Sequence, residues 1–334
     1  MKHLLSMALV CCCAVPLWSA EKLVLVAGGG SGAPGSPAAQ AAIGQPFGVD
    51  IDAQGNLFIA DFTEHRVWKV DAAGILSIVG GNGKKAFAGD GGPATEGSFD
   101  SMHDLVLDSE GNIYIADSNN LRVRKIDAKT GVLSTVAGNG KKGVSGDGGP
   151  GTEASLDGVA SLFFNSDRSK LYLTGFSSVV RILDMKTGII ETIKGFPGGR
   201  SVAVDSHGNV YVGGGTTLRV RRPDGTVETL IDKKTAPAGS LTIGDNTKHL
   251  GFDAEENVLL ADDFGHALKK YLVAEKKLVP LVGSGKRGTQ GLNGPPLAAE
   301  LNGPHGVYFH PASKTLYVCD SRNRRVLKVV NDNN

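Results

Sequence analysis

Short apolar runs alternate with polar turns along the whole chain. Residues 105–107 form one run and 113–116 a second, while 122–126 alternate polar with apolar positions and 132–137 form a fourth run. A period of two, interrupted by turns rich in Asp, Asn and Gly, is typical of short antiparallel strands. Residues 105–137 are therefore predicted to form four strands joined by tight turns.

The same four-strand unit recurs six times. A unit of this size cannot bury its own apolar face, so neighbouring units must stack on one another. Four short strands repeated around a ring describe a β-propeller, and the predicted fold class is all-β with six blades. Copies of the second-strand phrase lie at 55–61, 111–117, 170–175, 208–214, 256–262 and 315–320.

The sixth unit lacks a fourth strand, because it ends at Val330 close to the terminus. Residues 22–28 resemble 133–138, which belong to a fourth strand. We therefore expect the N-terminal strand to complete the last blade and close the ring. Closure removes the exposed edges that an open sheet presents.

The amino-acid composition and net charge indicate which kind of partner the protein can bind. Glycine accounts for 47 of 334 residues and is clustered between the apolar runs, which indicates turns. Lys and Arg number 35 against 34 Asp and Glu. A neutral protein is a poor match for nucleic acid, whose binding depends on neutralising phosphates.

The first twenty residues have the pattern of a signal peptide. Lys2 and His3 precede an apolar run at 4–17, which is too short to span a bilayer comfortably, and the small residues Ser19 and Ala20 suggest cleavage. We expect a signal peptide at 1–20, one propeller domain at 21–334 and export to the periplasm or medium. No transmembrane span is expected.

The cysteines leave a second outcome of export open. Cys11, Cys12 and Cys13 lie within the apolar run, so a lipid anchor on one of them is an alternative to free secretion. Cys319 is the remaining cysteine and is predicted to be a small buried hydrophobic residue. A domain without an internal disulfide must be held together by its core.

Residues 111–126 and 137–150 resemble NHL repeats, and the resemblance extends over about 22–330. It implies a six-bladed propeller, in agreement with the repeat count. The group and its look-alikes include protein- and RNA-binding scaffolds, an amidating lyase and a lactonase group. The fold alone therefore does not select the function.

Long glycine-rich connections join several blades. Residues 80–98 and 137–155 are near copies, 27–42 and 283–300 are looser ones, and the connection at 195–199 is short. These connections start on the same face as the turns between second and third strands, which we call the top face. We expect a top face walled beside blades 5, 6, 1 and 2 and low near blades 3 and 4.

Asp90 and Asp147 lie in Gly-Asp-Gly-Gly segments of two of these connections. Such an Asp commonly hydrogen-bonds its own turn. Calcium binding is the alternative, because Ca²⁺ prefers oxygen ligands.

The residue before each first strand is predicted to lie at the mouth of the central channel. These residues differ from blade to blade, as expected where a repeat is specialised for a ligand. They are Phe47, His103, Arg200, Lys248 and His305, with His249 one residue further along. His103, His249 and His305 are the candidate zinc ligands, in the manner that a resemblance to the amidating lyase implies.

An Asp and an Arg five positions apart recur at the second turn of several units. The pairs are Asp61 with Arg66, Asp117 with Arg122, and Asp320 with Arg325. We predict that a charge-assisted hydrogen bond within each pair fixes the turn. In the fourth unit Gly214 replaces the Asp while Arg219 is present.

Two functions follow as hypotheses. The first is an exported, monomeric and non-enzymatic propeller that binds a protein, a small molecule or a glycan on its top face, without a cofactor. The second is a metal-dependent hydrolase or lyase, lactonase-like or amidating-lyase-like, with Ca²⁺ or Zn²⁺ at the channel mouth. The sequence lacks the Gly-x-Ser-x-Gly, His-Glu-x-x-His and P-loop motifs, which favours the first.

Overall fold

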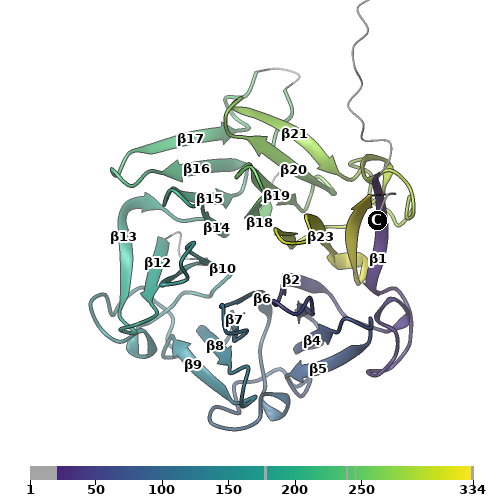
Figure 1. The fold of residues 1–334 in the computed structure, drawn as a ribbon. Helices are drawn as coiled ribbons and strands as arrows, with labels where there is room; N and C mark the ends of the chain where they lie inside the picture. The colour runs from purple at the N-terminus through teal and green to yellow at the C-terminus, as the bar shows by residue number, and fades with distance from the viewer. Residues whose placement is uncertain (1–20, 177–178, 238–239, 245, 332–334) are drawn as a thin grey trace, which may run out of the picture.

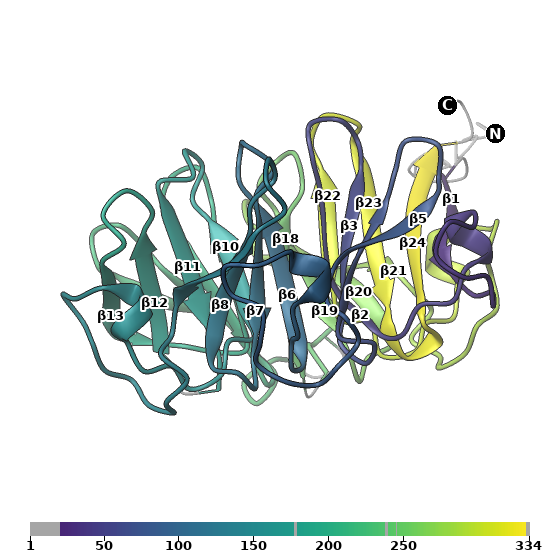
Figure 2. The same ribbon diagram turned by 90° about the horizontal axis from the view of Figure 1, so that it is seen from below.

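The computed structural model describes residues 21–176, 179–237, 240–244 and 246–331. The expected signal peptide at 1–20 lies outside these residues. Within them, six four-stranded antiparallel sheets surround a central axis (Figure 1). The side view shows the sheets standing side by side as the blades of a disc (Figure 2).

In each blade, the four strands run in order from the axis to the rim. Blades 1 to 3 consist of β2 (Pro46–Ile51), β3 (Leu57–Asp61), β4 (Arg66–Val70) and β5 (Leu76–Gly80); β6 (Met102–Leu107), β7 (Ile113–Asp117), β8 (Arg122–Ile126) and β9 (Leu133–Ala137); and β10 (Ser161–Phe164), β11 (Lys170–Thr174), β12 (Val179–Asp184) and β13 (Ile190–Pro197). Blades 4 to 6 consist of β14 (Ser201–Val204), β15 (Val210–Gly214), β16 (Thr217–Arg221) and β17 (Val227–Asp232); β18 (Thr247–Phe252), β19 (Val258–Asp262), β20 (Ala267–Leu272) and β21 (Lys277–Val282); and β22 (Val307–His310), β23 (Thr315–Asp320), β24 (Arg325–Asn331) and β1 (Glu21–Gly28).

The predicted ring closure is confirmed. β1 pairs antiparallel with β24, with Leu25 opposite Leu327, and the sheet order is β1-β24-β23-β22. The first described strand thus lies beside the last one at the rim (Figure 1). Closure leaves no unpaired side on β24.

The core lies between blades rather than within one. Ile59 and Leu76 of blade 1, for example, pack in one cluster with Cys319 and Val326 of blade 6. The free thiol of Cys319 is fully buried, as predicted. Burying one such aliphatic side chain stabilises the fold by about 1.5–3 kcal/mol, so each blade depends on its neighbours.

The long connections do not form the expected wall. The amide of Gly91 donates to the carbonyl of Leu133 at 2.8 Å, and the amide of Ala94 donates to that of Gly131, also at 2.8 Å. Residues 80–98 therefore run down the outer strand of the next blade, where the short 3-10 helix Ala94–Glu96 buries Ala94. Adjacent blades diverge toward the rim, and the connection fills the wedge between them (Figure 1).

Only the first part of each long connection reaches the top face. Asn120, in the turn after β7, donates from its side chain to the carbonyl of Ala86 at 2.9 Å.

Among the residues that the structure describes, no helix has the length and apolar character needed to cross a bilayer.

Candidate functional site

The inner strands bring three of the predicted mouth residues into contact. The rings of Phe47 and His305 stack with centroids 3.8 Å apart. The ring of His103 lies 5.4 Å from that of Phe47 and 5.8 Å from that of His305. Blades 1, 2 and 6 thus meet at the top end of the channel through aromatic side chains.

Two further aromatic residues extend this group. Phe62 stacks on Phe47 with centroids 4.3 Å apart, and Phe176 lies 5.6 Å from His103. Phe176 is 47% exposed, so the group reaches solvent. We call Phe47, Phe62, His103, Phe176 and His305 the aromatic cluster. Sequence reasoning missed Phe62 and Phe176, although each is an aromatic residue in a turn where the other repeats carry Ser, Gly or Asp.

The other side of the mouth is basic. The ammonium of Lys248 lies 3.4 Å from one oxygen of Asp263, and Arg322 lies 2.9 Å from the other. The guanidinium of Arg200 lies 4.8 Å from the ring of Phe176. Two cations therefore flank the carboxylate of Asp263, which also acts electrostatically on Arg200 and opposes the lowering of its pKa by burial. Burial and the neighbouring Arg200 lower the pKa of Lys248.

His103 and His305 are neutral at physiological pH. Burial and the charge of Arg200 lower the pKa of His103 to about 4. Burial, His103 and the nearby cations hold the pKa of His305 well below its ordinary value. Neither imidazole therefore adds to the positive charge of the mouth.

His305 presents an unused acceptor. Its Nδ1 lies 3.1 Å from the carbonyl oxygen of Phe47, which can only accept, so Nδ1 carries the proton and Nε2 carries a lone pair. Nε2 is buried and has no hydrogen-bond partner among the described residues. An unsatisfied buried acceptor costs about 1–3 kcal/mol, and such atoms commonly mark a ligand position.

His249 has a different role. Its Nε2 lies 3.2 Å from both oxygens of Asp104, which reaches it across the channel from the opposite blade. Burial lowers the pKa of His249, but the Asp104 carboxylate, the backbone of Val307 and the charge of Asp50 together outweigh burial and raise it. This buried pair links blades 2 and 5 across the centre of the ring.

Nδ1 of His103 lies 2.9 Å from the carbonyl oxygen of Ser101, so the three candidate zinc ligands have three separate partners. Among the described residues, one group of His, Cys, Asp or Glu has ligand atoms that all lie within 4.8 Å of one another, and it consists of Asp205, His207 and Glu256. This group lies in the turns after the first strands of blades 4 and 5, away from the mouth.

The predicted turn pairs form in one blade. Nε of Arg325 donates to Asp320 at 2.7 Å, as expected. In blade 2 the prediction is wrong: Asp117 pairs with Arg124 at 3.2 Å, and Arg122 instead lies over the ring of Phe87. Side chains two apart on a strand share a face, so either arginine can reach the Asp.

The pair is also wrong in blade 1. Asp61 accepts from the indole Nε1 of Trp68 at 2.9 Å, whereas Arg66 lies 3.6 Å from Glu64. Trp68 stands opposite Ile59 and Arg124 opposite Ile115, so the two occupy the same place in their blades. In blades 1 and 2, the Asp at the end of the second strand is therefore held by the third-strand residue that stands opposite the isoleucine, which is Trp68 or Arg124.

Asp90 and Asp147 anchor the long connections. Asp90 accepts from Arg124 at 2.6 Å, and Asp147 accepts from Arg181 at 2.6 Å. Each arginine belongs to the blade that follows the connection. Each of these carboxylates is thus paired with an arginine of the next blade, and calcium binding stays a prediction.

A hollow opens on the top face beside the mouth, over blades 3 and 4. Its volume is about 500 Å³. It lies beside the short connection between β13 and β14, residues 198–200. Its lining includes Phe176, Arg200, Gly214, Arg219, Asp232 and Lys234.

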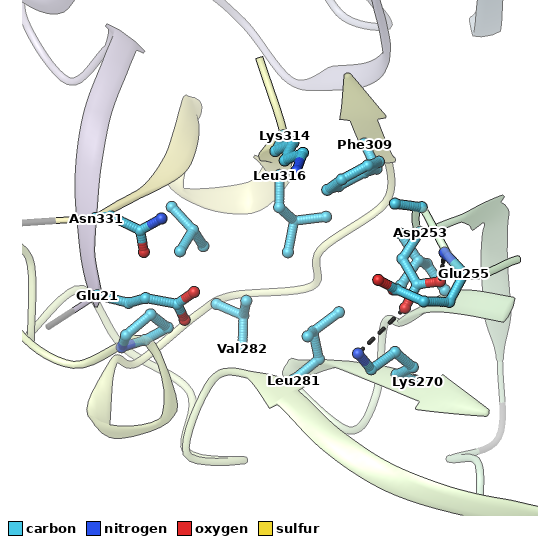
Figure 3. A pocket seen from close by; sticks show the side chains of 14 residues that line it. Glu21, Asp253, Glu255, Lys270, Leu281, Val282, Phe309, Lys314, Leu316 and Asn331 are labelled. Carbon is cyan, nitrogen blue, oxygen red and sulfur yellow. Dashed lines mark hydrogen bonds and ion pairs between the residues drawn. The ribbon is translucent and has the colours of Figure 1, made fainter. Parts of the chain in front are cut away.

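A second, smaller hollow lies between blades 5 and 6 (Figure 3). Its volume is about 230 Å³, and its floor includes Leu281, Phe309 and Leu316. Lys270, at its edge, pairs with Asp253 at 3.1 Å. This hollow contains no residue of the aromatic cluster and no basic residue of the mouth.

Comparison with known sequences supports the repeat assignment. The NHL repeat profile matches residues 99–126. NHL repeat-containing protein 2 of Gallus gallus is 25% identical over 84% of this chain and 46% of its own length. Protein SUPPRESSOR OF QUENCHING 1, chloroplastic, of Arabidopsis thaliana is 25% identical over 85% of this chain and 24% of its own length. The chain spans less than half the length of these relatives.

Solved structures share the fold. An auxiliary nutrient binding protein from Bacteroides ovatus superposes with a TM-score of 0.67 at 12% identity, covering 93% of this chain and 77% of its own. A streptogramin B lyase superposes with a TM-score of 0.56 at 10% identity, covering 94% and 99%. At these identities the likeness concerns the fold alone.

Proposed function

Since the chain is an NHL-repeat six-bladed β-propeller, we propose that it is an exported binding module that holds a ligand over the top end of its central channel. The ligand contacts are the aromatic cluster and the basic residues Arg200, Lys248 and Arg322. The propeller fold alone specifies neither a ligand nor its location.

The observation that carries the proposal is the specialisation of one repeat position. Positions that only support the fold keep similar residues, such as the turn residues Asp52, Asp108, Asp205 and Asp253. The mouth position holds five residue types across the six blades, with histidine in two of them: Phe47, His103, Ala160, Arg200, Lys248 and His305. A ligand without sixfold symmetry requires such differences, and the fold does not.

The unused acceptor of His305 supports the same location. A propeller that served only as a scaffold would gain stability by satisfying or replacing this buried nitrogen. A ligand that donates a hydrogen bond to Nε2 would remove the penalty. Structural neighbours described as nutrient binding proteins are consistent with such a role, although they share only the fold.

The binding test is a titration of the ¹⁵N-labelled domain with a library of small acids, sugars, amino acids and amines. We expect hits to shift backbone amides around the mouth, including those of Gly199 and Gly215. Phe176→Ala should weaken these hits. Val227→Ala, which trims a residue 41% exposed on the outer strand of blade 4, should not. Hits that shift only amides away from the top face, or that respond equally to both substitutions, would contradict the proposal.

Export has a separate test. Expression of the full chain with its native residues 1–20, followed by fractionation and mass measurement, should yield a mature protein that begins near Glu21. A mass increase on a cysteine at the new N-terminus would indicate the lipid-anchored alternative. Intact protein retained with residues 1–20 would contradict export.

A hydrolase or lyase is the second candidate, favoured by the two neutral imidazoles of His103 and His305 side by side. A lone pair on Nε2 of His305 can accept a proton from a bound molecule. If library hits are turned over, His305→Gln should abolish turnover while binding persists. Binding without turnover would exclude this candidate for those ligands.

A further inference from the structure

The hollow over blades 3 and 4 arises where one blade departs from the others. Arg219 on β16 stands opposite Val212, just as Arg124 on β8 stands opposite Ile115. The turn of blade 4 is shorter, because Gly214 pairs with Thr217 where Asp117 pairs with Arg122. Arg219 is therefore the counterpart of Arg124, which corrects the alignment based on sequence spacing.

In blades 2 and 3, the arginine at the position of Arg219 is paired with a carboxylate. Arg124 is fully buried and bonds both Asp117 and Asp90. Arg181, its counterpart in blade 3, bonds Asp147. The carboxylate comes from the end of the second strand, from the preceding long connection, or from both.

Blade 4 contains the arginine, Arg219, but neither of the two carboxylates that pair with Arg124 in blade 2. Gly214 stands where the second strand of blade 2 ends in Asp117, and the connection between β13 and β14, residues 198–200, is too short to supply a counterpart of Asp90. The side chain of Arg219 makes no ion pair or hydrogen bond with another described residue and lines the hollow.

A second guanidinium shares the hollow. Arg200 lines it, and its Nε is buried without a hydrogen-bond partner among the described residues. Lys234 adds a third cation, and Asp232 supplies the one carboxylate among the described lining residues. The exposed ring of Phe176 forms one wall beside Arg200.

We propose that this hollow binds the carboxylate or phosphate group of a small ligand, whose anionic oxygens take the place of the carboxylates that blade 4 lacks. The inference rests on the proposed binding function and names its ligand class. Two guanidinium groups form charge-assisted, paired hydrogen bonds to either anion. An attached planar or apolar part of the ligand lies against Phe176.

The test uses four small probes of one shape class: benzoate, phenyl phosphate, benzamide and benzylamine. Binding is followed by the amide shifts of Gly214 and Gly215 in the ¹⁵N-labelled domain. We expect at least one of the two anions to bind about tenfold or more tightly than the neutral amide, since a hydrogen bond to a charged group is worth about one such factor or more. Comparison of benzoate with phenyl phosphate distinguishes carboxylate from phosphate as the preferred anion.

Three variants locate the anion. Arg219→Gln should weaken the preferred anion about tenfold or more, for the same reason. Arg221→Gln removes the same charge from the same strand outside the hollow and should change the affinity little. Gly214→Asp restores an internal carboxylate beside Arg219 and should abolish anion binding while the domain stays folded.

The outcomes separate this inference from the function on which it rests. If benzamide or benzylamine shifts the same amides as strongly, or if Arg219→Gln has no effect, the ligand class is wrong while binding at the top face stands. If no probe shifts these amides, the hollow is not an anion site, and the library titration alone decides the binding function. Equal affinity for phenyl phosphate and inorganic phosphate would overturn the role of Phe176.

Discussion

The bridge between Asp104 and His249 gives the sharpest stability prediction. Asp104 accepts from the amides of Leu105 at 2.8 Å and Leu162 at 2.9 Å, and from His249 on the opposite blade at 3.2 Å. Asp104 is fully buried, so its carboxylate joins three blades at the centre of the ring.

The cost of losing each partner follows from these contacts. Asp104→Ala leaves two buried amides and one imidazole without an acceptor, and removing one partner of a buried charged pair costs about 3–5 kcal/mol. His249→Gln leaves both amides bonded and removes one charge-assisted hydrogen bond, which costs about 1.5–3 kcal/mol. Asp104→Ala is therefore expected to be the more destabilising change.

The pH dependence has a definite sign. The pKa of His249 is raised in the folded protein, so the contribution of its protonated form is fully present below its ordinary value of 6.5. That contribution is lost as the pH rises through the folded pKa. The stability gap between wild type and His249→Gln should be larger at about pH 5.5 than at about pH 9.

Urea unfolding followed by far-UV circular dichroism measures this gap. Comparing the two proteins at each pH is essential, because His103 and His305 have lowered pKa values and destabilise the folded state as the pH falls below 6.5. Their effect is common to both proteins and largely cancels in the difference. A gap that is equal at both pH values, or larger at the higher one, would refute the bridge as an ion pair.

Three further changes test the fold. Arg124→Ala should cost about 3–5 kcal/mol, because it removes the cation paired with the buried carboxylate of Asp117 and the donor to the carbonyl of Ser98. Gly138→Ala should cost about 2–5 kcal/mol, since φ is +90° and the new Cβ would overlap the carbonyl of Leu121, whereas Gly131→Ala at φ +68° meets nothing and should cost about 1–2 kcal/mol. Deletion of residues 21–28 should expose β24 and produce aggregates on size-exclusion chromatography.

Each of these has a result that would count against it. Urea unfolding of Arg124→Ala within experimental error of wild type would show that its bonds add nothing to stability. Equal losses for Gly138→Ala and Gly131→Ala would show that the close approach to Leu121 is unimportant. A monomeric deletion variant with an unchanged melting temperature would contradict closure as the source of stability.

The sequence predicted the features that depend on pattern. Alternation and repeat count specified six blades, and the unmatched strand at 22–28 specified the closure. The mouth position was found because Phe47, His103 and His305 occupy one place in the repeat. Each of these conclusions needs only the period of the repeat, which a single chain displays.

The features that depend on contacts across the fold were not predicted. The glycine-rich connection at 80–98 has no periodicity, and its path is set by backbone hydrogen bonds to the next blade. The partner of Asp117 was misassigned because Arg122 and Arg124 share one face of a strand. Arg219 was misaligned because a shorter turn in blade 4 changes the register, which spacing alone does not reveal.

Ring closure also orders the events of folding. β1 is the first described strand to be synthesised and β24 the last, yet Leu25 must pair with Leu327. Blades 1 to 5 contain only local strand pairs and can form as the chain emerges, whereas blade 6 must wait for the whole chain. A chain interrupted before β24 leaves β1 with nothing to pair with and one sheet edge open. Protection of these edges therefore requires synthesis through β24, because β1 and β24 cover each other only when both strands are present.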